Sequence, residues 1–340
     1  MADRADLIQD FLLRHGWGEA DRLLLAADAS FRRYERLQRD GERAVLMDAP
    51  PPQEDIRPFA TVARRLHALG LSAPEIRAED VEAGLLLLED FGDDTYTRVL
   101  AAGGDEKALY TLAVDVLVAL HGRFDDAAAA DIPPYDDARL LDEAALLADW
   151  YLPAVRGEPT PPGLRQGYLD LWRGVFATAR AVPPTLVLRD YHVDNLMLLA
   201  GRDGERACGL LDFQDAAIGP LTYDLASLLE DARRDVSPAL AHALTDRYLA
   251  AFPALDRDAF AASYAVLAAQ RSAKILGIFT RLDRRDGKPV YLHHIPRVWR
   301  WLEGDLEHPA LSALRGWFDA EIPPDKRVVP EAAGRAEGAA

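Results

Sequence analysis

Two short apolar segments that each end at ionisable residues constrain this chain more than any other feature. The first, residues 186–188, leads into the polar stretch 189–195, after which apolar residues resume. The second, residues 208–211, leads directly into Asp212. Short apolar runs bounded in this way are typical of buried strands. We expect paired strands here, with Asn195 and Asp212 meeting at the same end of the pair.

The polar stretch after the first segment carries the residue types of a phosphoryl-transfer site. Asp190 and Asn195 are separated by four residues. Such a carboxylate orients an attacking hydroxyl, and such a carboxamide oxygen holds Mg²⁺. Asp212 adds a carboxylate, and Mg²⁺ prefers a sparse set of oxygen ligands completed by water and phosphate. An ordinary polar hairpin loop would explain the first segment alone, but the second favours the catalytic interpretation.

These residues resemble a known family. Arg189, Asp190 and Asn195, followed by Asp212 and Phe213, resemble the catalytic and metal-binding residues of the protein-kinase-like fold. The arrangement is closer to the aminoglycoside phosphotransferase superfamily than to protein kinases. Within it, the chain is similar to the anomeric sugar kinases of bacterial cell-wall recycling, which phosphorylate N-acetylmuramate and N-acetylglucosamine at C1. This similarity is carried by residues 28–34, 47–51, 188–192, 212–216 and 219–225.

The resemblance implies an α+β, bilobal, protein-kinase-like fold. We expect a small, mostly antiparallel-sheet lobe that binds nucleotide at residues 1–90. A larger, mainly helical lobe at residues 91–322 would carry catalysis and substrate binding. Residues 323–340 are polar and rich in alanine and are expected to form a disordered tail.

The resemblance also implies roles for single residues. Asp190 would be the catalytic base, Asn195 and Asp212 the Mg²⁺ ligands, and Asp224 a structural carboxylate that holds the backbone of the catalytic loop. ATP would be the co-substrate and Mg²⁺ the cofactor. The reaction would be ATP-dependent phosphorylation of the C1 hydroxyl of N-acetylmuramate, N-acetylglucosamine or both, in peptidoglycan recycling.

Hydrophobic periodicity supports the two expected lobes. In the first third, Asp40-Gly41 predicts a hairpin turn. The elements expected there are helices at 3–15 and 59–69 and strands at 30–37, 44–48, 74–77 and 84–89. The helices expected after residue 90 are 108–121, 140–151, 163–180, 222–231, 238–250, 258–282 and 296–302. The strands expected there are 185–188, 196–199 and 208–213.

Composition excludes several classes of protein. The 340 residues carry a formal net charge of −17, which argues against nucleic acid or an anionic membrane as a partner. A single cysteine, Cys208, excludes an internal disulfide and a multi-thiolate metal site. The longest apolar runs, such as 85–88, are too short to span a membrane, and residues 1–20 contain no apolar signal segment. We expect a cytoplasmic protein that needs no obligate protein partner.

The expected nucleotide-binding lobe contains no lysine. Met47 stands where kinases of this fold place the lysine that binds the α- and β-phosphates, and the first 106 residues contain no lysine. Arginine must therefore neutralise the phosphates, and Arg32 and Arg33 are the nearest candidates. Side chains alternate along a strand, so one of the two would face the nucleotide. Which of them does so is open at this stage.

The linker after the fourth expected strand and two residues near the catalytic loop are further candidates. Glu89 and Phe91 lie in a segment that resembles the linker whose backbone reads the adenine edge. A buried edge strand with a turn is the alternative. Gln214 replaces the glycine of the Asp-Phe-Gly motif and is a candidate sugar contact, with simple packing as the alternative. His192 is expected either to contact the sugar or to make a structural hydrogen bond.

Three polar residues share one face of a long predicted helix. Gln270, Arg271 and Lys274 are spaced so that their side chains lie together. Arg271 is the candidate sugar ligand among them, but Arg271 and Lys274 could equally form a solvated face.

Three competing functions share part of this evidence. A kinase of aminoglycosides or of another small alcohol would carry the same core motifs. A catalytically inactive, nucleotide-binding pseudokinase would explain the missing lysine but not the presence of Asp190, Asn195 and Asp212. A carboxylate-based hydrolase would need no linker for adenine.

Overall fold

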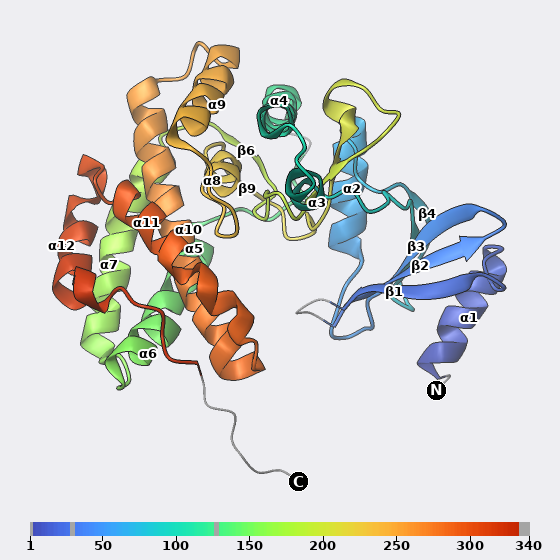
Figure 1. The fold of residues 1–340 in the computed structure, drawn as a ribbon, viewed down its shortest axis with the longest axis horizontal. Coiled ribbons are helices and arrows are strands. Elements are labelled where there is room, and N and C mark those ends of the chain that lie inside the picture. The colour runs from blue at the N-terminus through green and yellow to red at the C-terminus, as the bar shows by residue number, and fades with distance from the viewer. Residues whose placement is uncertain (1–2, 28–30, 126–128, 333–340) are drawn as a thin grey trace, which may run out of the picture. The chain divides into compact units, whose positions relative to one another are not determined.

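The computed structural model describes residues 3–27, 31–125 and 129–332, which form two compact units (Figure 1). The first unit comprises Met1–Arg123 and Val193–Ala216, and the second comprises Phe124–His192 and Ala217–Ala340. Both contain helices and strands, so the expected α+β class is confirmed. That residues 1–90 form a nucleotide-binding lobe and residues 91–322 a catalytic lobe stays a prediction.

A five-stranded sheet with strand order β1-β2-β3-β5-β4 forms the centre of the first unit. All its neighbouring strands are antiparallel. The strands are β1 (Asp21–Ala27), β2 (Arg33–Arg39), β3 (Glu42–Asp48), β4 (Ile76–Asp80) and β5 (Leu85–Leu88). Asp40 and Gly41 connect β2 to β3 with φ angles of 50° and 82°, the backbone of a two-residue hairpin turn. The hairpin predicted from Asp-Gly is therefore confirmed, although residue 30, the start of its first expected strand, lies outside the described residues.

Helix α1 (Arg4–Arg14) covers one face of this sheet. Its buried Phe11 packs in one cluster with Leu37 of β2 and Leu46 of β3. The other helices of the first unit are α2 (Arg57–Ala68), α3 (Tyr96–Ala101) and α4 (Glu106–Arg123). The predicted helices at 59–69 and 108–121 are confirmed.

A second, two-stranded sheet in the first unit pairs β7 (Leu196–Leu198) with β8 (Cys208–Leu210). The pair is antiparallel, with Leu196 opposite Leu210. Asn195 and Asp212 flank this end of the pair, as the spacing of the two apolar segments predicted. The 3₁₀ turn Gly204–Ala207 lies in the connection between the two strands.

The polar stretch 189–195 is not the loop of a hairpin. β6 (Pro184–Val187), which precedes it, pairs with β9 (Ala217–Pro220) in the second unit and not with β7. The simple hairpin interpretation of this stretch is therefore wrong. The chain instead passes from one two-stranded sheet to another within these few residues.

Helices dominate the second unit. They are α5 (Asp137–Leu146), α6 (Leu152–Arg156), α7 (Pro162–Ala179), α8 (Tyr223–Leu229), α9 (Pro238–Ala251), α10 (Arg257–Asp286), α11 (Ile295–Asp305) and α12 (Ser312–Glu321). A π-helical turn, Leu147–Tyr151, joins α5 to α6, where a single helix over 140–151 was expected. Short 3₁₀ turns occur at Pro289–His294, Pro309–Leu311 and Pro324–Lys326. The central helix is α10, which contributes many residues to a hydrophobic cluster of this unit.

Gly277 allows α10 to approach the end of α5 closely. A Cβ atom at this position would lie 2.2 Å from the backbone carbonyl carbon of Leu146 and 2.4 Å from its oxygen. No side chain fits at that distance, so the separation of the two helices depends on glycine here.

The chain remains engaged beyond the expected start of the tail. Arg327 donates to Glu303 at 2.7 Å and to Asp319 at 2.6 Å. Its guanidinium also lies 5.3 Å from the ring centre of Trp299. The rest of the expected tail, residues 333–340, lies outside the described residues. In the described part of the chain, no helix is both long enough and apolar enough to cross a membrane.

Candidate active site

Asn195 and Asp212 lie in contact at the end of the β7–β8 pair. The Nδ2 atom of Asn195 is 3.4 Å from Oδ2 of Asp212, and the backbone N–H of Leu211 donates to the Asn195 carbonyl at 3.0 Å. Both side chains are half-buried. The two residues that the sequence assigned to one cation are thus brought together by strand register.

The donor set of this pair fits Mg²⁺. An aspartate carboxylate and an asparagine carboxamide provide hard oxygen atoms, and the orientation of an amide is interchangeable between its oxygen and nitrogen. Among the described residues, no three His, Cys, Asp or Glu side chains gather into a metal site of their own. A cation here would therefore take its remaining ligands from phosphate oxygens and water. The metal-binding role of Asn195 and Asp212 stays a prediction.

Gln214 lies against the same carboxylate. Its Nε2 atom donates to Oδ1 of Asp212 at 2.9 Å. Through this bond Gln214 helps to orient the Asp212 carboxylate. The expected contact of Gln214 with the sugar stays a prediction.

Two residues of the site have a backbone conformation that is unfavourable for them. Arg189 has φ = 70° and Asp212 has φ = 56°. Apart from Asp40 in its hairpin turn, no other non-glycine residue of the described chain has a positive φ. Such conformations cost about 1–3 kcal/mol and persist where surrounding contacts enforce them, most often at functional sites. The strain coincides with the two motifs that the sequence identified.

Asp224, at the start of α8, holds the backbone before Asp190. Its carboxylate accepts from the N–H of Leu188 at 2.6 Å and from the N–H of Arg189 at 2.8 Å. Both bonds hold backbone that directly precedes Asp190, and the structural role that the resemblance implies for Asp224 stays a prediction. Burial raises the pKa of Asp224 to about 7, although the two backbone N–H groups oppose the shift.

Asp190 and His192 lie in the second unit. The Asp190 side chain is half-buried and its backbone N–H donates to the Leu188 carbonyl at 2.9 Å. His192 is buried. Burial, with smaller effects of Arg233 and Arg271, lowers the pKa of His192 well below its usual range, so this imidazole is neutral at physiological pH. The convergence of Asp190 with Asn195 and Asp212, which lie in the first unit, stays a prediction.

A buried carboxylate that the sequence did not indicate, Glu143 of α5, binds Arg189 of the predicted catalytic loop. It accepts hydrogen bonds from Arg189, from Lys274 Nζ at 3.0 Å, from Tyr135 at 2.5 Å and from Gln270 at 3.4 Å. Burial alone would raise the pKa of Glu143, but the two cations outweigh it and the pKa is lowered.

The solvated-face interpretation of Arg271 and Lys274 is wrong. Arg271 is 5% exposed and Lys274 is 8% exposed. Gln270 and Lys274 are engaged by Glu143, which explains why their face of α10 is turned inward. Arg271 remains the candidate sugar ligand of the three.

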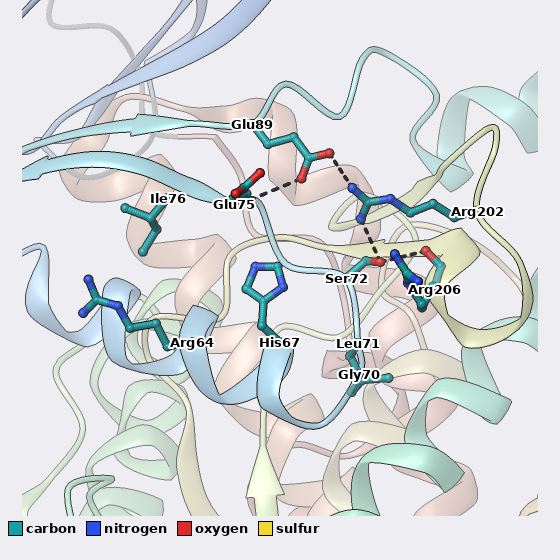
Figure 2. Close-up of a pocket in the computed structure, with 10 residues that line it drawn as sticks. All are labelled: Arg64, His67, Gly70, Leu71, Ser72, Glu75, Ile76, Glu89, Arg202 and Arg206. Carbon is teal, nitrogen blue, oxygen red and sulfur yellow. Dashed lines mark hydrogen bonds and ion pairs between the residues drawn. The ribbon is translucent and has the colours of Figure 1, made fainter. Parts of the chain in front are cut away.

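Glu89, in the predicted adenine linker, is fixed through its side chain (Figure 2). Its carboxylate pairs with Arg202, which also donates to Ser72 Oγ at 2.9 Å. The Arg202 guanidinium lies 5.4 Å from the ring centre of Phe91. Glu89, Arg202 and Ser72 are among the residues that line a cavity of about 650 Å³.

The linker backbone retains groups that an adenine edge would need. The N–H of Glu89 donates to the carbonyl of Glu75 at 2.8 Å and is therefore committed. In the part of the chain that the structure describes, the Glu89 carbonyl and the Phe91 N–H have no such partner. The linker thus offers one acceptor and one donor two residues apart, and its nucleotide-binding role stays a prediction.

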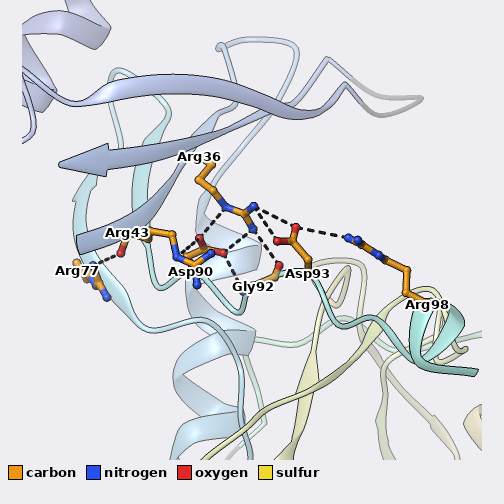
Figure 3. A network of polar contacts seen from close by, with 7 residues as sticks. All are labelled: Arg36, Arg43, Arg77, Asp90, Gly92, Asp93 and Arg98. Atoms are coloured by element: carbon orange, nitrogen blue, oxygen red, sulfur yellow. Dashed lines mark hydrogen bonds and ion pairs between the residues drawn. The ribbon is translucent and has the colours of Figure 1, made fainter. Parts of the chain in front are cut away.

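Arg36 of β2 stabilises the linker from the sheet (Figure 3). Its guanidinium donates to both oxygens of Asp90, at 2.7 and 3.0 Å, and to the Gly92 carbonyl at 3.0 Å. It also pairs with Asp93 at 3.0 Å. The sequence contained no signal for this network, because the partners are far apart along the chain.

The two candidate phosphate-binding arginines have different surroundings. The Nε atom of Arg32 lies 3.5 Å from Glu54, and the Arg32 side chain is 11% exposed. Arg33 is exposed and lies on the same face of β2 as Leu37, which packs against α1. The face of Met47 is the opposite one, because Met47 pairs with Tyr34. Strand alternation therefore excludes Arg33 from the face that carries Met47.

Together, the strained loop, the paired Asn195 and Asp212 and the antiparallel sheet are the features of a protein-kinase-like phosphotransferase. The sequence matches the Phosphotransferase enzyme family over residues 21–262, and the chain belongs to this family.

Two relatives of this chain carry the name of the same kind of kinase. The chain is 40% identical to the N-acetylmuramate/N-acetylglucosamine kinase of Caulobacter vibrioides, over 93% of this chain and 96% of that protein. It is 39% identical to the kinase of the same name from Pseudomonas aeruginosa, over 93% and 94% of the two chains.

Solved structures share the fold at much lower identity. A choline/ethanolamine kinase family protein from Mesorhizobium loti superposes with a TM-score of 0.59 at 17% identity, covering 93% of this chain and 99% of that one. The GDP complex of an aminoglycoside 2'-phosphotransferase gives a TM-score of 0.61 at 15% identity, covering 89% and 98%. These similarities extend the fold assignment over 89–93% of the chain.

Proposed function

We propose that this protein transfers the γ-phosphoryl group of ATP to the C1 hydroxyl of N-acetylmuramate and N-acetylglucosamine. The observation that carries the proposal is the Asn195–Asp212 pair, 3.4 Å apart, in a chain 34–40% identical to kinases named for these sugars. We further propose that the reaction takes place in the cytoplasm and serves the recycling of peptidoglycan sugars.

Asp190 orients the acceptor hydroxyl and takes its proton as the phosphoryl group transfers in line, without a phospho-enzyme. The C1 hydroxyl is a hemiacetal and more acidic than an ordinary alcohol, so a carboxylate with no special activation suffices. Asp224 keeps the backbone before Asp190 in place through its two hydrogen bonds. Asn195 and Asp212 would hold Mg²⁺, which neutralises charge on the β- and γ-phosphates when bound.

For the nucleotide, we assign the adenine edge to the Glu89 carbonyl and the Phe91 N–H. Arg32 is our candidate for the phosphates in place of the missing lysine. Its support is that Arg33 lies on the face of β2 that packs against α1, and that Glu54 already fixes Arg32.

The decisive experiment is a phosphorus NMR assay for the sugar 1-phosphate. The protein is incubated with magnesium ATP and either sugar, and in parallel with a kanamycin-type aminoglycoside. We expect 1-phosphate from both amino sugars and no product from the antibiotic. Phosphorylation of the antibiotic alone would overturn the substrate assignment, and no turnover with any acceptor would favour a pseudokinase.

Two variants test the assigned roles in the same assay. Asp190→Asn should lose at least about 100-fold in kcat while ATP still binds. Asp212→Ala should abolish magnesium-dependent turnover. Retention of full activity by either variant would show that the catalytic loop is assigned wrongly.

A further inference from the structure

Arg271 is a buried cation without an acceptor in the described structure. It lies in the middle of α10 and is 5% exposed. Its guanidinium makes neither a hydrogen bond nor an ion pair with any residue that the structure describes. A buried charged group without hydrogen bonds is costly, and each such group calls for an explanation.

The neighbouring polar residues of α10 are already engaged elsewhere. Gln270 and Lys274 both donate to Glu143. Glu143 receives four donors in all, so its two oxygens have no capacity left for Arg271.

The acidic groups whose charge acts on Arg271 do not pair with it in the described structure. Asp224 accepts the backbone N–H groups of Leu188 and Arg189. In the described structure Glu230 forms no ion pair with Arg271, although one oxygen of its buried carboxyl has no hydrogen bond. These carboxyls offset part of the charge of Arg271 at longer range, but none of them provides the acceptor that its N–H groups require.

The helix of Arg271 packs against α8, whose Asp224 binds the backbone of the predicted catalytic loop. The charges of Arg271 and Arg233 both act on His192, which follows Asp190 by two positions. His192 is neutral, so it adds no competing charge. An anion that entered beside this loop would meet a guanidinium fork with its donors free.

We propose that Arg271 binds a carboxylate on the acceptor sugar and so makes the enzyme favour an acidic amino sugar over a neutral one. This inference rests on the proposed function. The two acceptor sugars differ at one group, because N-acetylmuramate carries a lactyl ether with a carboxylate that N-acetylglucosamine lacks. A planar guanidinium binds a carboxylate through two parallel hydrogen bonds, which a neutral hydroxyl cannot reproduce.

The test compares kcat/KM for the two sugars in wild type, Arg271→Gln and a matched control. Arg285→Gln removes the same charge from an exposed position of the same helix. We expect the ratio of kcat/KM for N-acetylmuramate to that for N-acetylglucosamine to fall about 30- to 100-fold in Arg271→Gln. The change should lie mainly in KM for the acidic sugar. Arg285→Gln should keep the wild-type ratio.

Removing the charge from the substrate gives a second measurement that does not depend on how the variant folds. For wild type, the methyl ester of N-acetylmuramate should lose about as much kcat/KM as the free acid loses in Arg271→Gln. In Arg271→Gln, acid and ester should be used equally. Arg271→Lys keeps the charge without the fork and should fall between wild type and Arg271→Gln.

An unchanged sugar ratio in a folded Arg271→Gln protein would overturn the inference, and so would an equal loss for both sugars. Wild type that uses ester and acid equally would also contradict it. In those cases water, and not a substrate carboxylate, satisfies Arg271. Failure of the proposed function looks different, since wild type would then phosphorylate neither sugar.

Discussion

The pKa values of two buried carboxylates of the second unit, Glu143 and Asp224, are shifted in opposite directions. Glu143 is 8% exposed and faces two cations, Arg189 and Lys274, and its pKa is lowered. Asp224 is 1% exposed and has two neutral backbone donors; its burial raises its pKa to about 7. Two buried carboxyls can therefore differ in charge. The ionised form is retained where the hydrogen-bond donors are cations, as they are around Glu143.

The difference matters because both groups support the same loop. Glu143 binds the side chain of Arg189, and Asp224 binds the backbone N–H of the same residue. The side chain is thus held by a carboxylate that is charged at neutral pH, whereas the backbone is held by a carboxyl that changes its charge near pH 7.

Glu143→Ala tests the first half of the comparison and should have the largest effect. It leaves Arg189 and Lys274 buried without their counter-charge, which we expect to cost about 3–5 kcal/mol of unfolding free energy. Urea denaturation measures this loss. Glu143→Gln keeps the acceptor and should cost less than the alanine variant. Equal stability of Glu143→Ala and wild type would contradict the comparison.

Asp224→Asn tests the second half. An asparagine carbonyl can serve one of the two N–H groups well and leaves the other poorly satisfied, so stability should fall by about 1–3 kcal/mol. Because the backbone of the catalytic loop is released, kcat should fall more than KM rises. The exposed Asp246→Asn on α9 is the control, and it should match wild type in both stability and kcat.

The pH dependence of stability should have opposite signs for the two groups. The pKa of Asp224 is raised from 3.8 to about 7, so its contribution is complete below pH 3.8 and is lost as pH rises towards 7. The pKa of Glu143 is lowered from 4.5, so its contribution is present above pH 4.5 and is lost as pH falls.

Denaturation of wild type and Asp224→Asn between pH 4 and pH 8 measures the first of these terms. The stability advantage of wild type should shrink as pH rises through this range. An advantage that is independent of pH would mean that Asp224 keeps its ordinary pKa in the fold.

Lys274→Met should have the smallest effect. It removes one of two cations and leaves the Arg189–Glu143 pair balanced, while methionine fills most of the volume. We expect a change in unfolding free energy of no more than about 1 kcal/mol. A loss as large as that of Glu143→Ala would identify Lys274, and not Arg189, as the principal counter-ion.

Long helices and the hairpin could be predicted from the sequence because their signals are local. Five helices and strands were missed: β1, α3, α6, β9 and α12. Three of them show why. Strand β1 shows no alternation, since Leu23 and Leu24 are both largely exposed. Helix α3 has six residues, too few for a period to emerge. Strand β9 contains Gly219 and Pro220, which sequence patterns assign to turns.

Contacts of the candidate site were likewise predictable only where the partners lie close together in the sequence. The meeting of Asn195 and Asp212 followed from two strands close together in sequence. The bonds of Glu143 to Lys274 and of Arg36 to Asp90 span 131 and 54 positions. No local pattern marks such partners, so only the folded chain reveals them.

Gly277 affects the ion pair between Lys274 and Glu143. Gly277 lies one turn beyond Lys274 on α10 and touches the end of the helix that carries Glu143. Any larger residue there would force the two helices apart and lengthen the bond between ammonium and carboxylate. The charges next to the predicted catalytic loop therefore depend on the absence of a Cβ atom at position 277, although glycine itself carries no charge.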